Sequence, residues 1–184
     1  MNDTDAIKKC LAGETESFAF LIKKYQYEAF GHATAILGNS EDALDALQET
    51  FLDAFRTLKK FDVSRRFYPW LYTILRNRCF KMLATHRKEV RAEFGKLEIL
   101  SVSAEDKSND KVTLVEKALL EVSPEDREIL TLKHLDGLNY EIIAERLDIP
   151  VGTVMSRLYY ARRRFREKVN RFQEKDDFRE LENE

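Results

Sequence analysis

The sequence predicts an all-α protein built from two small helical domains, and its composition and length are the main reasons. The chain has 184 residues, of which six are glycine and three are proline, while 35% are charged and 43% are hydrophobic. A sequence with so few turn residues favours long amphipathic helices. Its length allows one medium core or two small ones, because single cores commonly belong to domains of about 100 to 150 residues.

A short helix and then a long core-facing helix are predicted at the start of the chain. The short helix ends near Gly13. Over residues 18–36 apolar side chains recur at the spacing of one helical stripe, and Gly38 follows them. The long helix is predicted to end there, because glycine adopts the left-handed backbone conformation at no steric cost.

The next predicted helix follows two residues that can cap it, Asn39 and Ser40, and runs to about Lys60. Its buried side is expected to consist of Leu44, Leu47, Phe51, Phe55 and Leu58. The opposite side holds Glu41, Asp42, Asp45, Glu49 and Asp53, with Gln48 at the margin and Leu52 among the acids. Acids are typical of any solvated helix face, but an outward leucine among them suits a protein partner with a basic, partly apolar surface. The residues alone leave both interpretations open.

A loop over residues 61–68 leads to Pro69 at the first position of another helix, which continues to about Lys88. Its buried side is predicted to hold Leu71, Ile74, Leu75 and Met82. The other side interleaves Trp70, Thr73, Arg76, Asn77, Phe80, Lys81, Arg87 and Lys88. Cations, flat rings and an amide together suit unpaired nucleic acid, whose backbone, base faces and base edges they contact. The alternative is that Trp70 and Phe80 only pack in a core.

An acidic, flexible linker is predicted between the two domains. Over residues 91–110 the helical periodicity weakens and Ser, Asp, Glu and Lys accumulate, which is the composition of a solvated linker. The first domain is therefore predicted over residues 1–92, the linker over 93–110 and the second domain over 111–184.

The second domain is predicted to contain four helices, and the last two have the layout of a helix-turn-helix. The helices cover residues 112–121, 124–135, 140–147 and 151–172, with Ser123 and Asn139 as N-caps. The core of the motif is predicted to be Ile143, Leu147, Ile149, Val154 and Leu158. Ala144 is small where the two helices approach closely. Asp148 occupies the turn, and aspartate tolerates left-handed backbone better than most residues.

The last predicted helix separates apolar from polar side chains. With successive residues about 100° apart, one side holds Val154, Leu158, Ala161 and Phe165. The other side holds Thr153, Ser156, Arg157, Tyr160, Arg163 and Arg164. Hydroxyl and guanidinium groups suit the base edges and phosphates of duplex DNA. A solvated basic face is the alternative, but the turn, Ala144 and the segregated face together favour DNA binding.

The formal net charge of −2 conceals a separation of acidic from basic segments. Basic residues gather in two helices, as Arg76, Arg78, Lys81, Arg87, Lys88 and Arg91 in one and Arg157, Arg162, Arg163, Arg164, Arg166, Lys168 and Arg171 in the other. Acids gather over residues 41–53, 93–110 and 174–184. Separate charged surfaces indicate separate partners.

These motifs, in this order, resemble the sigma factor family of bacterial RNA polymerase, and in particular its extracytoplasmic function group. They are the acidic helix EDALDALQETFLDAF, the segment FYPWLYTILRNRCFKML, the acidic linker and the helix-turn-helix EIIAERLDIPVGTVMSRLYYAR. Together they cover nearly the whole chain, and the long middle domain of housekeeping sigma factors has no room here. The resemblance implies a factor that binds core RNA polymerase and directs promoter-specific transcription initiation.

The resemblance also implies which residues meet which partner. The coiled coil of the polymerase β′ subunit would contact Asp45, Gln48, Glu49, Leu52 and Asp53. The start-proximal promoter element, melted to single strands, would contact Phe67, Tyr68, Trp70, Arg76, Asn77, Phe80 and Lys81. Among these, Asn77 matches a base-reading position, and Phe67 and Tyr68 match a loop that receives a flipped base. The upstream element, as duplex DNA, would contact Thr153, Ser156, Arg157, Tyr160, Arg163 and Arg164.

Further roles and partners follow from the same resemblance. The linker would thread the RNA exit channel of the polymerase, where nucleic acid charge would be mimicked by Glu98, Glu105, Asp106 and Asp110. The polymerase β flap and an anti-sigma factor are the other partners that the resemblance implies.

A stand-alone helix-turn-helix regulator that binds duplex DNA as a dimer is the alternative function. The aromatic-basic helix and the separate acidic helix argue against it. An enzyme is not expected, because His32, His86 and His134 have no sequence partners at catalytic or metal-ligand spacing. Cys10 and Cys79 stand far apart without a CxxC motif, so no metal site, disulfide or cofactor is expected.

The sequence also predicts a cytoplasmic protein without membrane insertion. Its N-terminus lacks the apolar core of a signal peptide, and no stretch approaches the roughly 20 apolar residues that a membrane-spanning helix needs.

Overall fold

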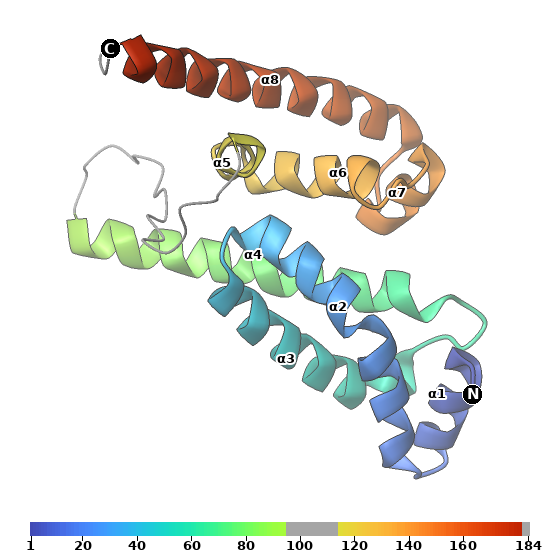
Figure 1. Cartoon of the computed structure of the whole chain (residues 1–184). Coiled ribbons are helices and arrows are strands. Elements are labelled where there is room, and N and C mark those ends of the chain that lie inside the picture. The colour runs from blue at the N-terminus through green and yellow to red at the C-terminus, as the bar shows by residue number, and fades with distance from the viewer. Residues whose placement is uncertain (95–113, 182–184) are drawn as a thin grey trace. The chain divides into compact units, whose positions relative to one another are not determined.

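The computed structural model of the chain describes residues 1–94 and 114–181, of which 90–94 and 175–181 are described by their backbone alone. The chain divides into two compact units, and every element described in them is a helix (Figure 1). The all-α fold class with two helical domains is therefore confirmed. The predicted linker beyond residue 94, with its proposed charge mimics Glu98, Glu105, Asp106 and Asp110, lies outside the described residues.

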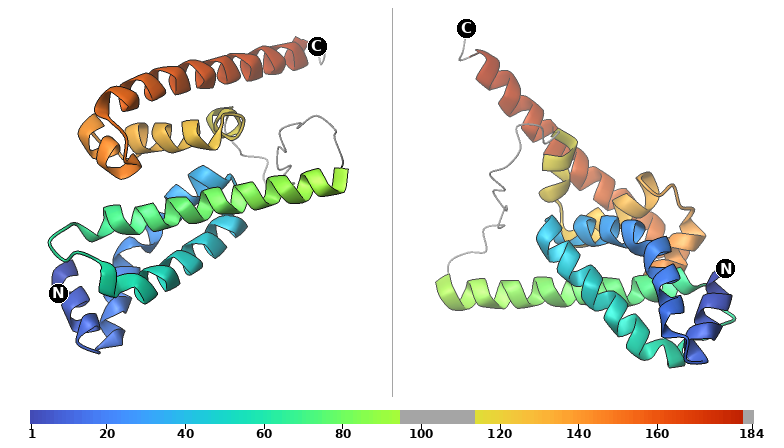
Figure 2. Two further views of the ribbon diagram at one scale, coloured as in Figure 1. Left: turned by 180° about the vertical axis from the view of Figure 1, so that it is seen from behind. Right: turned by 60° about the horizontal axis from the view of Figure 1, so that its bottom comes forward.

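The first unit contains, in its described part, α1 (Asp3–Leu11), α2 (Phe18–Leu37), α3 (Ser40–Thr57) and α4 (Phe67–Phe94). Short 3₁₀ turns connect some of them, at Thr15–Ser17 and Leu58–Lys60. The helices α2, α3 and α4 pack against one another, and α1 packs on α2. Figure 2 shows this bundle from two further sides.

Local capping explains where α2 ends and α3 begins. Gly38 follows α2 with a φ of 86°, a left-handed conformation that favours glycine. The Asn39 side chain accepts a hydrogen bond from the backbone N–H of Asp42 at 2.8 Å, which satisfies one of the free donors at the start of α3. Both boundaries agree with the sequence prediction.

The buried side of α3 differs from the predicted one. The structure buries Ala43, Ala46, Leu47, Thr50, Phe51 and Ala54. Leu44 and Phe55 were predicted to be buried, but they are 48% and 40% exposed, so this prediction was wrong. The reason is that α2 and α4 both pack against α3, and a line of small alanines lets these helices approach closely. The close approach leaves the two larger side chains at the edge of the contact.

Helix α4 begins at Phe67, two residues before the predicted start at Pro69. A proline is tolerated anywhere in the first turn, because the first N–H groups of a helix have no acceptor within it. After Pro69 the buried residues are Leu71, Tyr72, Leu75 and Cys79, whereas Ile74 and Met82, predicted as buried, are only half-buried. The helix continues past Lys88, its predicted end, to Phe94.

The second unit contains, in its described part, α5 (Leu114–Leu120), α6 (Pro124–His134), α7 (Tyr140–Leu147) and α8 (Val151–Leu181). The helices α5, α6 and α7 each pack against α8. Helix α8 continues past Phe172, its predicted end.

The predicted helix-turn-helix geometry is present in α7, α8 and the turn between them. Asn139 caps α7 by accepting a hydrogen bond from the N–H of Ile142 at 2.8 Å. Asp148 adopts a left-handed conformation, with a φ of 52°. Of the predicted core, Ile143, Leu147, Val154 and Leu158 are buried with Ala144, and Ile149 is half-buried. This core fixes the first turns of α8 so that their other side faces solvent.

Candidate nucleic-acid and protein interfaces

The outward side of α3 combines exposed apolar side chains with exposed acids. Leu44, Leu52 and Phe55 are exposed large apolar residues, and Gln48 lies between them on the same side of the helix. Glu41, Asp45 and Glu49 are exposed beside them. We call this surface the docking face, and it consists of Glu41, Leu44, Asp45, Gln48, Glu49, Leu52 and Phe55. An apolar stripe flanked by acids suits a partner that is basic and partly apolar.

Asp53 was predicted to contact polymerase, but the structure places it half-buried at the edge of α3 that faces α4. Its carboxylate pairs with the guanidinium of Arg78 on α4 and lies 3.5 Å from Nη1 of Arg56. Nη2 of Arg78 also lies 3.6 Å from Oε2 of Glu49. The acidic edge of α3 is therefore partly neutralised by a cation of the same unit.

On α4, part of the predicted strand-binding set faces solvent. Asn77 and Lys81 are exposed, and Trp70, Arg76 and Phe80 are half-buried. The Arg76 guanidinium lies over the Phe80 ring, with Cζ 4.7 Å from the ring centroid. A cation above an aromatic face presents both charge and a flat π surface, which suits phosphate contact and base stacking.

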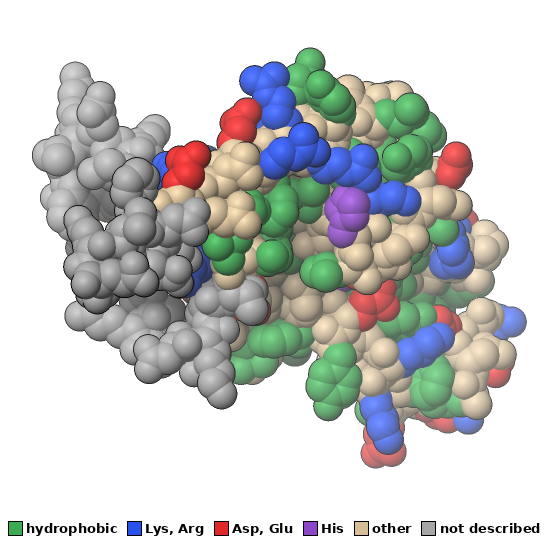
Figure 3. Space-filling model, turned by 45° about the horizontal axis from the view of Figure 1, so that its top comes forward, with side chains coloured by type: hydrophobic (Ala, Val, Ile, Leu, Met, Phe, Trp, Pro, Cys, Tyr) green, Lys and Arg blue, Asp and Glu red, His purple; other side chains and the backbone are tan. Residues whose placement is uncertain are grey.

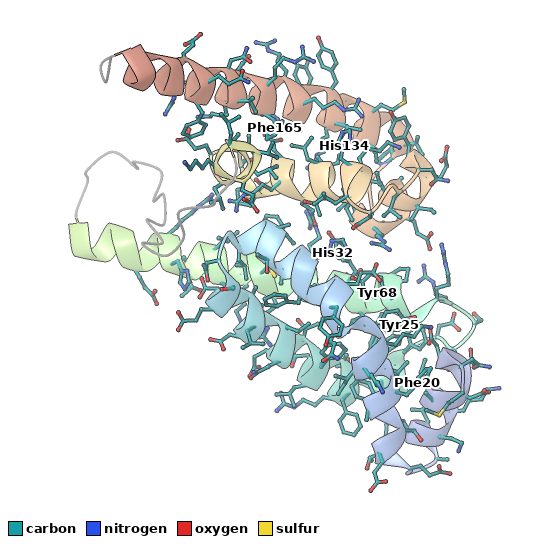
Figure 4. The ribbon with its side chains drawn as sticks, viewed as in Figure 1. Phe20, Tyr25, His32, Tyr68, His134 and Phe165 are labelled. Carbon is teal, nitrogen blue, oxygen red and sulfur yellow. The ribbon has the colours of Figure 1, made fainter. Side chains whose placement is uncertain are left out.

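Phe67 and Tyr68 are buried in the first turn of α4, which corrects their predicted position in a loop. The Phe67 ring packs against Phe61 and Trp70 at centroid distances of 5.7 and 5.6 Å. The Tyr68 ring stacks on Tyr25 of α2 at 5.0 Å, and Figure 4 shows these two side chains close together. A pocket for a flipped base at these positions would require both rings to leave the core.

The predicted duplex-reading side chains of α8 are mostly at the surface. Ser156, Arg157, Tyr160 and Arg163 are exposed, and Thr153 is half-buried. Arg163 donates from Nε to Glu167 at 3.1 Å across one helical turn. Figure 3 shows Lys and Arg side chains in a row on the face that it presents. Exposed cations and hydroxyls on one helix face are suited to phosphate and base-edge contacts.

Arg164 belongs to the predicted duplex-reading set, but it is tied to α6. Its Nε and Nη2 donate to the two carboxylate oxygens of Asp126 at 2.5 and 2.7 Å, and these hydrogen bonds raise the pKa of Arg164. Bidentate pairs of this kind are strong and directional, so Arg164 holds α8 on α6. Arg162 likewise donates from Nε to Nε2 of His134 at 3.2 Å. Burial and the neighbouring cations Arg162 and Lys133 lower the pKa of His134.

Two residues that the sequence prediction did not select, Met155 and Tyr159, share the exposed side of α8. They are 54% and 63% exposed, and the Tyr159 ring meets that of Tyr160 edge-on at 5.3 Å. Apolar groups at such positions can contact the methyl groups of thymine in the major groove. Their spacing in the sequence could have identified them. Met155, Tyr159 and Arg163 lie four residues apart, and residues at this interval share one side of a helix.

The histidines and cysteines do not assemble a metal site in the described residues. No group of three or more His, Cys, Asp or Glu side chains there is placed to hold a metal ion. His32 is buried, and His86 lies with Nδ1 3.6 Å from a carboxylate oxygen of Asp42. Cys10 and Cys79 are both buried and are not joined in a disulfide. None of the helices in the described residues has the length and apolar character needed to cross a membrane.

Comparison with known proteins accounts for both units. Residues 21–89 match the family model described as Sigma-70 region 2, and residues 113–165 match the model described as Sigma-70, region 4. The RNA polymerase sigma-H factor of Pseudomonas aeruginosa is 30% identical over 87% of this chain and 90% of its own length. The ECF RNA polymerase sigma-E factor of Escherichia coli is 31% identical over 92% of this chain and 95% of its own length. The chain belongs to the extracytoplasmic function (ECF) sigma factor family.

Solved structures share the fold of this sigma factor. The sigma factor RpoE of Bartonella quintana, in complex with the anti-sigma factor NepR, has a TM-score of 0.67 at 24% identity and covers 84% of this chain and 98% of its own. CnrH, in complex with the cytosolic domain of CnrY, has a TM-score of 0.61 at 20% identity and covers 91% of this chain and 97% of its own.

Proposed function

We propose that this sigma factor binds core RNA polymerase through the docking face, captures the melted start-proximal promoter element on α4 and reads the upstream element with α8. The observation that carries the proposal is the presence of three chemically different exposed surfaces on the two units that match Sigma-70 regions 2 and 4. A stand-alone regulator would use α8 but would leave the docking face and α4 without a function. We therefore set that alternative aside.

The docking face supports the protein contact. Leu44, Leu52 and Phe55 lose unfavourable contact with water when a partner covers them, and the acids beside them attract a basic surface. The coiled coil of the polymerase β′ subunit is the partner that the family resemblance implies. Leu44 and Phe55 extend the residue set proposed from the sequence, whereas Asp53 contributes less because it pairs with Arg78.

The exposed side of α4 supports contacts with unpaired DNA. The amide of Asn77 can donate to and accept from a base edge, and the ammonium group of Lys81 can pair with a phosphate. The stacked pair of Arg76 and Phe80 offers a flat surface to a neighbouring base. These contacts form only after the promoter strands separate, since the base edges are paired in the duplex.

An anti-sigma factor is a further proposed partner, and the cytoplasm is the proposed location. RpoE and CnrH, which share this fold, were each solved with a second protein, the anti-sigma factor NepR for RpoE and the cytosolic domain of CnrY for CnrH. We propose no catalytic step for this chain, because its three surfaces suit binding.

Transcription in vitro tests the proposal. Core RNA polymerase should initiate at a specific set of sites on genomic DNA fragments when this chain is added, and sequencing of the RNA 5′ ends should reveal two shared promoter elements upstream of the start. A set of 5′ ends that is the same with and without the chain would contradict the proposed function.

Arg157→Ala should lower the affinity for the upstream element by about 1–3 kcal/mol and relax the preference at one base pair, if its guanidinium contacts a guanine. Arg163→Ala should instead weaken binding to all duplexes alike. It should also reduce the slope of log affinity against log salt concentration by about 1. Binding of duplexes with single base-pair changes, measured at several salt concentrations, separates the two effects. A uniform loss for Arg157→Ala would remove this residue from the base-reading set.

Asn77→Ala should lower the equilibrium constant for formation of the open promoter complex about fivefold, since it removes a hydrogen bond worth about 1 kcal/mol to a base edge. Permanganate reactivity of unpaired thymines measures the opening. A promoter already melted over the start-proximal element should restore little of the lost open complex, because the exposed bases must still be read.

Thr73→Ala is the matched control for Asn77→Ala. Thr73 is exposed one turn earlier on α4, and its hydroxyl donates to the backbone carbonyl of Pro69 at 3.0 Å. We expect this change to leave promoter opening within about twofold of the parent. Equal opening by the parent and by Asn77→Ala would exclude Asn77 as a base contact.

A further inference from the structure

Arg78 lies at the boundary between the docking face and the strand-binding side of α4. It follows Asn77 directly in the sequence, and its guanidinium is paired with Asp53 and lies 3.6 Å from Glu49 on α3. Its side chain is 26% exposed, so it is within reach of solvent and of a ligand. The same guanidinium thus touches one docking-face residue, Glu49, while its backbone belongs to the helix proposed to capture DNA.

Helix geometry places Arg78 close to the proposed phosphate contact on α4. With successive residues about 100° apart, Arg78 is about 60° around the helix from Lys81 and three residues before it. Residues three apart are neighbours on a helix surface. A rotation of the long Arg78 side chain away from α3 therefore brings its guanidinium beside the ammonium group of Lys81, on the strand-binding side.

The ion pairs that hold Arg78 are of the kind that exchange readily. Asp53 and Glu49 are partly exposed, with 33% and 49% of their side-chain surface accessible, and ion pairs at such positions contribute little to stability. Asp53 keeps a cation 3.5 Å away, Arg56, when Arg78 leaves. The phosphate group is a strong alternative acceptor, because it forms charge-assisted, often bidentate hydrogen bonds with a guanidinium.

We propose that Arg78 is a concealed phosphate-binding residue, which Asp53 and Glu49 hold in the free chain and which binds the backbone of the unpaired promoter strand once it is released. A basic partner on the docking face competes for Glu49 and so loosens the hold on Arg78. Docking and strand capture then favour one another, because coupling between two binding events is reciprocal. The inference rests on the proposed function of the docking face and of α4.

The test uses the full-length chain without polymerase and a fluorescent single-stranded oligonucleotide that carries the start-proximal element. Asp53→Asn removes the nearer of the two charges that hold Arg78, so it should tighten binding about fivefold at about 0.1 M salt, where charges more than about 10 Å apart are largely screened. One additional phosphate contact should also steepen the dependence of log affinity on log salt by about 0.7. Fluorescence anisotropy at several salt concentrations measures both quantities.

Asp45→Asn is the matched control, because it removes the same charge from the exposed surface of the same helix, two turns away from Asp53. We expect this change to raise the affinity for the oligonucleotide less than about twofold and to leave the salt dependence of that affinity unchanged, because long-range charge is screened. The double variant Asp53→Asn, Arg78→Gln should return to the parent affinity. This reversal identifies Arg78 as the released group.

Three outcomes would overturn the inference: equal gains from Asp53→Asn and Asp45→Asn, no gain from Asp53→Asn, or a gain that persists when Arg78 is replaced by glutamine. Transcription by core polymerase with the parent chain is measured alongside. If the parent chain directs initiation but Asp53→Asn does not tighten oligonucleotide binding, only the proposed role of Arg78 is contradicted. A parent chain that directs no initiation contradicts the proposed function, whatever the oligonucleotide binding shows.

Discussion

Replacing Phe67 with alanine is expected to lower the free energy of unfolding of the first unit by about 3–5 kcal/mol. The ring is 2% exposed, and its centroid lies 6.5, 5.7 and 5.6 Å from those of Phe18, Phe61 and Trp70. Truncation leaves a cavity that these rings fill only in part. Trp70 is the single tryptophan of the chain and belongs to the first unit, so its fluorescence during urea denaturation reports on that unit.

Phe55→Ala is the matched control for the loss of a phenyl ring. The Phe55 ring also contacts Phe18, at 5.2 Å, but it is 40% exposed. Its removal should cost about half as much or less, because less apolar surface returns to water. If Phe67→Ala unfolds at the same urea concentration as the parent and yet impairs promoter opening, Phe67 acts on DNA and its assignment to the core is wrong.

Features that depend on a few neighbouring residues could be predicted from the sequence. Asn39, Ser123 and Asn139 cap helices, because each needs only a side-chain oxygen and a backbone N–H three residues later. Gly38 and Asp148 occupy left-handed positions for an equally local reason, which is the low steric cost of that conformation for these residue types.

The start of α4 shows the limit of a local signal. Pro69 favours a helix start nearby, but proline fits throughout a first turn, so it does not determine the first residue. The helix starts at Phe67, where the burial of two aromatic rings, Phe67 and Tyr68, adds to its stability. The sequence prediction therefore extended the loop, which ends at residue 66, two residues too far and placed both rings in it.

The orientation of α3 depends on helices distant in the sequence and could not be predicted from its own periodicity. Leu44 and Phe55 fit an apolar stripe, but the packing of α2 and α4 decides which part of the stripe is buried. Small residues such as Ala46 define the contact, and a hydrophobic pattern gives them less weight than leucine or phenylalanine.

Ion pairs between residues far apart in the sequence could not be predicted either. Arg164 pairs with Asp126, 38 residues away, and Arg78 pairs with Asp53, 25 residues away. A run of charges in the sequence does not reveal which members have partners within the fold. The sequence prediction, which assigned Arg164 and Asp53 to external partners, could therefore not show that both also have partners within the fold.

Leu52→Lys should weaken the binding of core polymerase at least about 30-fold, which corresponds to about 2 kcal/mol. Leu52 is 47% exposed among the acids of the docking face, with Gln48 one turn before it. Lysine removes the apolar contact and places a cation against a partner that is expected to be basic, so both the hydrophobic and the electrostatic parts of the contact are lost. Lysine is a good helix former, so α3 should keep its helicity. Titration of labelled core with the chain measures the affinity, and circular dichroism measures the helicity.

Leu11→Lys is the control for Leu52→Lys, because it makes the same change at a leucine of similar exposure, 41%, in the same unit. Leu11 is the last residue of α1, where the helix dipole favours a cation, so the control should not destabilise its helix. We expect its affinity for core to stay within about twofold of the parent. Equal losses from both variants would mean that added positive charge anywhere on the first unit weakens binding. Unchanged affinity for Leu52→Lys would show that polymerase does not cover the docking face, and the contact with core would then have to lie on another surface of the chain.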